Sequence, residues 1–247
     1  MNDFDAINRH AYGPGWAGLF ERYFGQLPDT EDAVATLAEL AAGRRVLEFG
    51  VGTGRLALPL RATGLDVHGI DNSEPMLEQL RRKPDGDRLP VTLGDIATAK
   101  VDGGFGLVFV ATHTLLALRT QDAQVRCFDN AAAHLDSGGL FVVEVMSPHA
   151  RALSSGDCRT VEVDPEQITL YVAVVDPIAQ LLQGSALYLR DRELPVVRTT
   201  ASRYIWPSEL DLMARVAGLR LQDRWGGWTR TPFTAGSPNQ VSVFAKP

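Results

Sequence analysis

The sequence predicts an α/β protein built on a doubly wound, mostly parallel sheet, with an antiparallel β insertion after the fifth strand. From about residue 44 to residue 146, short runs rich in β-branched residues alternate with longer amphipathic runs, which is the pattern of parallel strands covered by helices. After Ser147, polar and apolar residues alternate in short runs that are separated by turn residues, which is typical of antiparallel strands. Two last strands bring the main sheet to seven.

The first half of the chain supplies five strands and the helices between them. The fourth and fifth strands are almost continuously apolar, which is typical of central strands buried on both faces. Gly138 and Gly139 follow the last of these helices and favour a helix stop there. We expect the strands at residues 45–49, 66–70, 90–93, 106–111 and 140–145, and the helices at residues 55–62, 74–82 and 120–135.

The second half predicts an antiparallel unit and then a return to the core. Asp-Pro pairs at Asp164-Pro165 and Asp176-Pro177 mark two of the turns. A further helix over residues 207–217 begins with Pro207 and is stopped by Gly218, the usual asymmetry of helix ends. We expect the antiparallel strands at residues 159–163, 168–175, 181–189 and 196–205, and the two last strands at residues 220–224 and 241–245.

Composition argues against several classes of function. The 247 residues carry 24 Lys and Arg against 30 Asp and Glu, so a basic excess that would bind nucleic acid is missing. Cys127 and Cys158 are too few for a disulfide framework, which favours a reducing compartment. No apolar run approaches the roughly 18 residues that span a bilayer, and the first residues lack a signal-peptide pattern. We therefore expect a cytoplasmic protein with neither a nucleic-acid nor a membrane partner.

The most informative segment is a strand that runs into a glycine-rich turn and then a helix. Gly50, Gly52 and Gly54 allow positive φ and close approach of a ligand, and the following helix offers oriented N–H groups. An adenosine-containing ligand is the natural candidate. The dinucleotide fingerprint G-x-G-x-x-G needs a glycine where Arg55 stands, which argues against a nicotinamide or flavin enzyme. Glu48 adds an acid two positions before the first glycine.

Two further acids follow the second and third predicted strands. Asp71 lies about 20 residues beyond the first glycine, where a carboxylate can accept both hydroxyls of a ribose. Asp95 follows the third strand, where its side chain could accept the amino group of an adenine. Ile96 would then lie against the ring. The order of these motifs therefore predicts a site for the whole adenosine.

In order and spacing, these motifs resemble those of the class I S-adenosylmethionine-dependent methyltransferases. The resemblance covers residues 44–146 and 207–247, and it implies a Rossmann-like methyltransferase fold with S-adenosylmethionine as the cofactor. It implies that Asp71 holds the ribose and that the glycines shape the methionine pocket. The full set of implied cofactor residues is Glu48, Gly50, Gly52, Gly54, Asp71, Asn72, Met76, Asp95, Ile96 and Ala111, with Tyr12 and Trp16 folded over the cofactor.

The insertion and the entry into the last helix resemble the small-molecule branch of this family. We accordingly expect an N-terminal helical lid (1–43), a cofactor-binding core (44–148), an insertion on the acceptor side (149–206) and a completion of the core (207–247). The Asn/Asp-Pro-Pro-aromatic signature of enzymes that methylate nucleic-acid amino groups is replaced after strand four by Ala111-Thr112-His113-Thr114. The acceptor is therefore expected to be a small molecule methylated on N or O, of the natural-product class.

His113 is the candidate catalytic residue because it follows strand four, which lies beside strand one in this fold. An imidazole with a pKa of about 6.5 suits proton removal near neutral pH. A purely structural role at the strand end is the alternative. No cluster with metal-ligand spacing is visible, so no metal is expected. The candidate acceptor residues are His149, Tyr204, Trp206, Trp228 and Arg230.

Two other functions remain open at this point. A nucleotide-cofactor oxidoreductase would use the same kind of glycine turn, although Arg55 argues against it. A regulatory protein that binds S-adenosylmethionine without turnover would keep every motif described above. The choice between N- and O-methylation and the oligomeric state are also left open.

Overall fold

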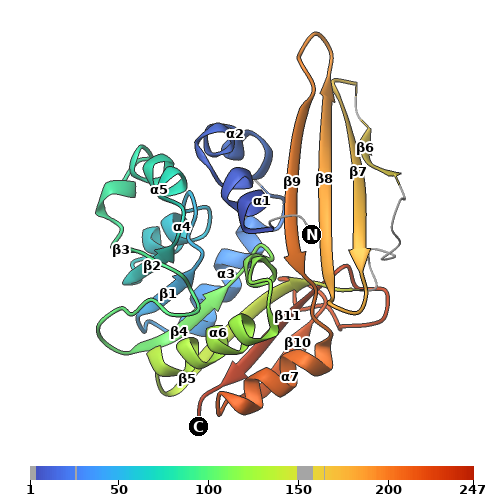
Figure 1. Ribbon diagram of the computed structural model, residues 1–247. Coiled ribbons are helices and arrows are strands. Elements are labelled where there is room, and N and C mark those ends of the chain that lie inside the picture. The colour runs from blue at the N-terminus through green and yellow to red at the C-terminus, as the bar shows by residue number, and fades with distance from the viewer. Residues whose placement is uncertain (1–3, 26, 149–157, 164) are drawn as a thin grey trace.

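The computed structural model describes residues 4–25, 27–148, 158–163 and 165–247, and their strands form two sheets (Figure 1). The main sheet has seven strands in the order β10-β11-β5-β4-β1-β2-β3. Its strands are β1 (Val46–Phe49), β2 (Val67–Asp71), β3 (Val91–Leu93), β4 (Phe105–Val110), β5 (Leu135–Met146), β10 (Arg220–Trp225) and β11 (Asn239–Ala245). The first five are parallel, and β11 pairs antiparallel with both β5 and β10. The predicted doubly wound sheet is confirmed.

Helices cover both faces of this sheet. One buried apolar cluster contains residues of α6 (Gln121–His134) and α7 (Pro207–Val216). The other contains residues of α3 (Thr30–Ala41), α4 (Ala57–Ala62) and α5 (Glu74–Arg81). All six residues of β4 are buried, as expected of a central strand between two helical layers. Side-chain caps at Ser73 and Thr120 begin α5 and α6.

The largest difference from the predicted boundaries is at the start of β5. The sequence predicts this strand at residues 140–145, but it begins at Leu135, directly after α6 ends, and so includes residues 136–139. Pairing with β4 shifts between Phe105↔Leu135 and Leu107↔Leu140, so the four intervening residues form a bulge. Gly138 supplies the positive φ of 71° in that bulge, and its N–H donates to the carbonyl of Lys246 at 2.9 Å.

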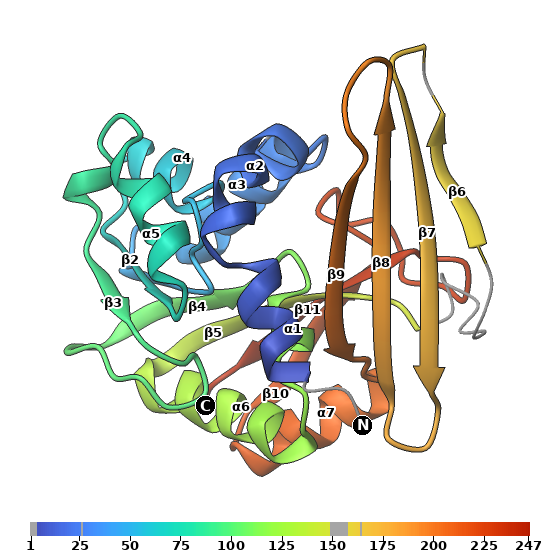
Figure 2. The same cartoon turned by 45° about the horizontal axis from the view of Figure 1, so that its top comes forward.

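The second sheet is the predicted antiparallel insertion. Its strands are β6 (Cys158–Val163), β7 (Gln167–Asp176), β8 (Leu181–Arg190) and β9 (Val196–Arg203), paired in that order. Helices α1 (Phe4–Ala11) and α2 (Pro14–Phe24) lie between this sheet and the main domain, and α1 packs on β9 (Figures 1 and 2). Asn8 of α1 exchanges two hydrogen bonds with the backbone of Ala201, at 2.8 and 2.9 Å.

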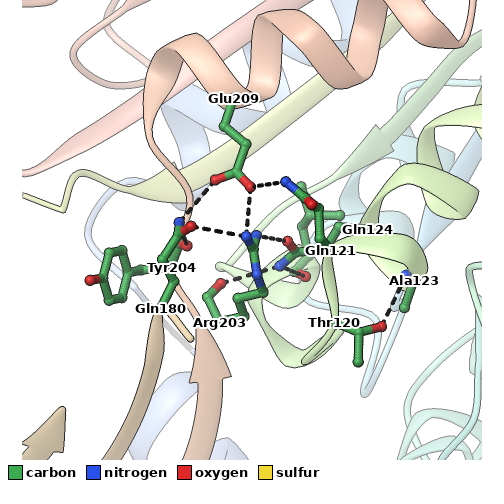
Figure 3. Close-up of polar contacts among 9 residues, drawn as sticks. Thr120, Gln121, Ala123, Gln124, Gln180, Arg203, Tyr204 and Glu209 are labelled. Carbon is green, nitrogen blue, oxygen red and sulfur yellow. Dashed lines mark hydrogen bonds and ion pairs between the residues drawn. The ribbon is translucent and has the colours of Figure 1, made fainter. Parts of the chain in front are cut away.

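A buried polar network anchors the end of β9 to the core (Figure 3). Arg203 donates to Gln124 of α6 at 2.6 Å, to Glu209 of α7 at 2.6 Å and to Gln180 at 3.0 Å. Gln180 in turn donates to Glu209 at 2.9 Å, so the turn before β8 is tied in as well. The insertion is therefore fixed to both helices of one face. In the part of the chain that the structure describes, no helix has the length and apolarity that a membrane crossing requires.

Candidate functional site

The glycine turn after β1 presents one open face. All three glycines have positive φ: 78° at Gly50, 51° at Gly52 and 80° at Gly54. A Cβ on Gly50 would lie 2.4 Å from a methyl of Thr114, and one on Gly54 would lie 2.4 Å from Leu80, so both are packed against protein. A Cβ on Gly52 would meet only the terminal methyl of Met76, at 3.6 Å. The loop is therefore closed at both ends and open at Gly52, where a ligand can approach the backbone.

Asp71 joins this loop to the end of β2. One carboxylate oxygen accepts the N–H of Gly52 at 2.7 Å, and the other accepts the N–H of Ser73 at 2.8 Å. Burial raises the pKa of Asp71, and the N–H groups of Ser73, Gly52 and Asn72 oppose the shift. A carboxylate offers about four lone-pair sites, so each oxygen can still accept a hydroxyl. The residue is fixed at the position that the resemblance assigns to the ribose.

Glu48 is a buried acid with an unmet hydrogen-bonding need. Its side chain is on β1, only 5% exposed, and its Oε2 has no hydrogen-bond partner among the described residues. Burial raises the pKa of Glu48 well above its usual range, and the charge of Arg55 opposes the shift. Buried polar atoms in folded proteins are almost always satisfied. A ligand that brings a donor, such as the ammonium of a methionine moiety, fits this oxygen.

The other predicted cofactor residues lie along the same edge. Asp95 follows β3, and its Oδ1 accepts the N–H of Ala97 at 2.8 Å. Ile96 is buried in the cluster on the α6 side, while Asn72 is exposed beside Asp71. Ala111 is buried directly after β4. The structure thus places these residues at the carboxyl ends of neighbouring parallel strands, where ligands bind in open α/β sheets. Their individual roles stay predictions.

The N-terminal helices touch the cofactor loops directly. Ser73 donates to the carbonyl of Tyr12 at 2.7 Å. Glu21 of α2 accepts the hydroxyl of Thr53 in the glycine turn and pairs with Lys83 at 2.7 Å. Trp16 is 5% exposed, and its ring stacks on Tyr23 and on Tyr188 of β8. These helices therefore bridge the cofactor loops and the insertion.

Packing divides the N-terminal segment in two. Ala33, Leu37 and Ala41 of α3 are fully buried in a cluster of the main sheet. Helices α1 and α2 instead contact the insertion and α5. We therefore restrict the proposed lid to α1 and α2 and place α3 in the core.

A pocket of about 360 Å³ opens beside the glycine turn. It brings together the segment before α3, the end of β4, the last part of β5 and the start of β11. Its lining consists of Leu27, Pro28, Asp29, Arg55, Thr112, His113, Glu144 and Asn239. His113 thus lies at a pocket beyond strand four, as predicted for the acceptor side. Its catalytic role stays a prediction.

Sequence reasoning missed the other charged groups of this pocket. In the sequence, Arg55 is notable only because it occupies the position of the third glycine of the dinucleotide fingerprint. In the structure, its guanidinium donates to Thr30 at 2.8 Å and to Thr112 at 2.6 Å. Glu144 is 3% exposed and accepts the N–H of Thr112 at 2.7 Å. Burial raises the pKa of Glu144, and the Thr112 N–H opposes the shift. The sequence contains one signal for this site: Glu144 is a single acid within the apolar run of strand five.

Among the residues that the structure describes, none of the predicted acceptor residues lines this pocket, although the side chain of Trp228 acts on the pocket residue Glu144 and opposes the rise of its pKa. Tyr204 is buried and meets Trp206 edge to face at 6.3 Å, beside the Arg203 network. Trp228 is buried in the cluster beneath α3. Arg230 pairs with Glu39 at 2.8 Å on the outer side of that helix. His149 lies outside the described residues, so all five assignments stay predictions. Among the residues that the structure describes, no group of three or more His, Cys, Asp or Glu side chains is arranged to hold a metal ion.

The chain is similar to known methyltransferases. A family model described as a methyltransferase domain matches residues 46–139. The structure of the CcbJ methyltransferase from Streptomyces caelestis is 38% identical, with a TM-score of 0.88, over 96% of this chain and 98% of that one. The cypemycin N-terminal methyltransferase of a Streptomyces species is 26% identical over 83% of this chain and 84% of its own. A dTDP-4-amino-2,3,4,6-tetradeoxy-D-glucose N,N-dimethyltransferase from Saccharopolyspora spinosa is 31% identical over 57% of this chain and 52% of its own.

The strand order, the antiparallel β11 and the glycine turn after β1 define a Rossmann-like methyltransferase. Because the similarity to a solved methyltransferase extends over nearly both whole chains, the chain belongs to the class I S-adenosylmethionine-dependent methyltransferase family. Its cofactor is S-adenosylmethionine. The nucleotide-cofactor oxidoreductase considered as an alternative is thereby rejected.

Proposed function

We propose that this enzyme methylates an amine nitrogen of a small natural-product intermediate. The observation that carries the proposal is the pocket beside the glycine turn, where Asp29 and Glu144 outnumber the single fixed cation Arg55 and His113 completes the wall. Such a pocket favours an acceptor that arrives as an ammonium ion. The names of two relatives, the cypemycin N-terminal methyltransferase and the amino-sugar N,N-dimethyltransferase, point to nitrogen as well.

The cofactor supplies an activated methyl group on a sulfonium centre. On the protein side, Gly52 would leave room for it, Asp71 would accept the ribose hydroxyls and Glu48 would meet the ammonium of the methionine moiety. These residues would hold the cofactor in place, and alignment is the main contribution an enzyme makes to such an in-line displacement. Helix α2, which touches Thr53, and the turn between α1 and α2, which touches Ser73, exclude water from the same place.

The acceptor nitrogen attacks with its lone pair, so an ammonium ion must first lose a proton. His113 is the residue of the pocket wall suited to accept it near neutral pH. In the transfer that the bound cofactor would supply, the new N–C bond would form as the C–S bond breaks, the electron pair of the C–S bond would remain on sulfur and S-adenosylhomocysteine would be released. A hydroxyl acceptor would need the same proton transfer from a much weaker acid, during rather than before the attack. Loss of His113 is therefore expected to cost an O-methyltransferase more than an N-methyltransferase.

Matched acceptor pairs test the proposal. One pair is a dTDP-4-amino sugar and its 4-hydroxy counterpart, and another is a short peptide with a free and with an acetylated N-terminus. Within these pairs, we expect S-adenosylhomocysteine release and a mass gain of one methyl only for a member that carries a free amine. Methylation of the hydroxyl partner alone would contradict the choice of nitrogen. Tight binding of S-adenosylmethionine without transfer to any acceptor would favour a regulatory protein.

A further inference from the structure

The backbone leaving β4 has an unusual conformation at the wall of the pocket. Two consecutive residues, Thr112 and His113, adopt left-handed φ values of 53° and 62°. This region disfavours every residue with a Cβ, and a β-branched threonine is a clear outlier there. Such strain persists only where surrounding contacts fix it, and it concentrates at functional sites. The question is therefore what holds this turn.

Two buried charged side chains hold Thr112, one through its backbone and one through its side chain. Glu144 of the neighbouring strand β5 accepts the Thr112 N–H at 2.7 Å. Arg55 donates to the Thr112 hydroxyl at 2.6 Å. Arg55 is itself fixed by Thr30 at 2.8 Å and lies 3.8 Å from Asp29. The turn is therefore clamped between β5 and the segment that begins α3.

Holding the turn with buried charged side chains costs desolvation free energy, which a purely structural role does not explain. Glu144 is 3% exposed, and the side chain of Arg55 is 8% exposed. Well-packed apolar side chains often stabilise a core as well as a buried charged pair or better, because charges lose their hydration. Both charged groups also border the pocket, on either side of the turn that carries His113. Their arrangement points to control of geometry at the pocket.

We propose that Glu144 and Arg55 are positioning residues for methyl transfer, which hold the Thr112–His113 turn in its left-handed conformation and so present His113 to the acceptor. This inference rests on the proposed function, because that function places the acceptor in this pocket. Glu144 and Arg55 act through the turn, and His113 is the group that meets the acceptor. A displacement of about 1 Å at a catalytic group can cost on the order of 100-fold in rate.

A matched pair of variants at Thr112 separates positioning from packing. Thr112→Val keeps the shape and the β-branch but cannot accept the bond from Arg55, whereas Thr112→Ser keeps the hydroxyl. With the best acceptor of the panel, we expect kcat to fall at least tenfold in Thr112→Val and less than threefold in Thr112→Ser. The affinity for S-adenosylhomocysteine should stay within threefold in both. Turnover of Thr112→Val within threefold of the wild type would overturn the proposal.

A second pair tests the other end of the clamp without any acceptor. Glu144→Gln retains an oxygen that can accept the Thr112 N–H, and Glu144→Met does not. In NMR spectra of the complex with S-adenosylhomocysteine, strong intraresidue contacts between Hα and the amide proton report positive φ. We expect these contacts at Thr112 and His113 in the wild type and in Glu144→Gln, and their loss in Glu144→Met. Their persistence in Glu144→Met would overturn the role of Glu144.

The turnover measurements on the Thr112 variants and the NMR measurements on the Glu144 variants can fail independently of each other. If the wild type methylates no acceptor, the proposed function fails, and the NMR comparison still decides whether Glu144 holds the turn. If Glu144→Met does not fold, the Thr112 pair decides, because it leaves Glu144 in place. Asp85→Asn is the control, since it breaks only the exposed ion pair with Arg88 and is expected to change neither readout.

Discussion

The edge of the parallel core and the antiparallel insertion are built in different ways. At the core edge, Asp71 joins the two cofactor loops to each other across 19 residues of sequence, by accepting the N–H of Gly52. The insertion is held by side chains distant in sequence, such as Asn8 on Ala201 and Arg203 on Gln124. Local contacts tie cofactor recognition to a short motif. Long-range contacts hold the insertion, which therefore has no comparable short motif in the sequence.

The largest predicted effect comes from removing the side-chain contacts that attach the insertion to the core. Arg203→Met removes one partner of a buried ion pair. It leaves the side-chain oxygen of Gln124 without its donor, and it leaves Glu209 with only the amides of Gln121 and Gln180. The loss of one partner of such a pair typically costs about 3–5 kcal/mol. We expect a large fall in the free energy of unfolding, measured by urea denaturation.

The matched control removes an exposed arginine of the lid. Arg22→Met breaks the pair with Glu193, whose two side chains are 40% and 44% exposed, and such pairs contribute about 0–1 kcal/mol. An equal effect of the two variants would mean that the network in Figure 3 does not anchor the insertion.

The second prediction closes the open face of the glycine turn. Gly52→Val forces a branched side chain into the space beside Met76 at a φ of 51°. We expect calorimetry to show binding of S-adenosylhomocysteine weakened by at least about 100-fold, or about 3 kcal/mol. Gly227→Ala, at a glycine with open space around it and no positive φ, should bind normally. Normal binding by a folded Gly52→Val would refute the assignment of the loop.

The third prediction concerns the ribose. Asp71→Ala removes a carboxylate that would pair with two hydroxyls, at a cost of about 1–3 kcal/mol, or roughly 5- to 150-fold in affinity. Because Asp71 also accepts two backbone N–H groups, some loss of melting temperature should accompany it. Asp66→Asn at the opposite end of β2 serves as the control for a lost surface carboxylate. Unchanged affinity in Asp71→Ala would place the ribose elsewhere.

The smallest predicted effect is a gain in stability. The pKa of Glu48 is raised by burial, so the folded protein without cofactor binds this proton more tightly than the unfolded chain. The free energy of unfolding should therefore fall as pH rises from about 4.3 through the raised value. The Glu48→Gln variant lacks the ionisable carboxyl, so it avoids this pH-dependent loss of stability and should have a higher melting temperature than the wild type at neutral pH. A gain of about 1 kcal/mol is about 2–4 °C for a chain of this size.

Thermal scans of both proteins between about pH 4 and pH 8 would show this difference. The same variant should bind S-adenosylhomocysteine more weakly, because the amide replaces the charge that meets the ammonium. A Glu48→Gln protein that melts lower than the wild type at neutral pH would contradict the account.

The core edge could be predicted closely because its signals are local. Alternating runs and turn residues placed the strands, and the glycines with Asp71 and Asp95 indicated the cofactor. The pocket could not be predicted in the same way, because Asp29, Arg55 and Glu144 are far apart in sequence and meet only after the sheet forms. The aromatic residues expected at the acceptor site are also good core residues, and Trp228 is buried in an apolar cluster. Composition alone does not distinguish these two uses of an aromatic side chain.

Hydrogen exchange with and without S-adenosylhomocysteine tests the division between the two regions most directly. The account predicts that the ligand slows exchange in residues 50–54, 71–73 and 95–97. It also predicts slower exchange in α2 and in the turn before it, through their contacts with Thr53 and Ser73. It predicts no change in β7 and β8, the two central strands of the insertion. Protection concentrated in β7 and β8, with exchange at residues 50–54 unchanged, would contradict it.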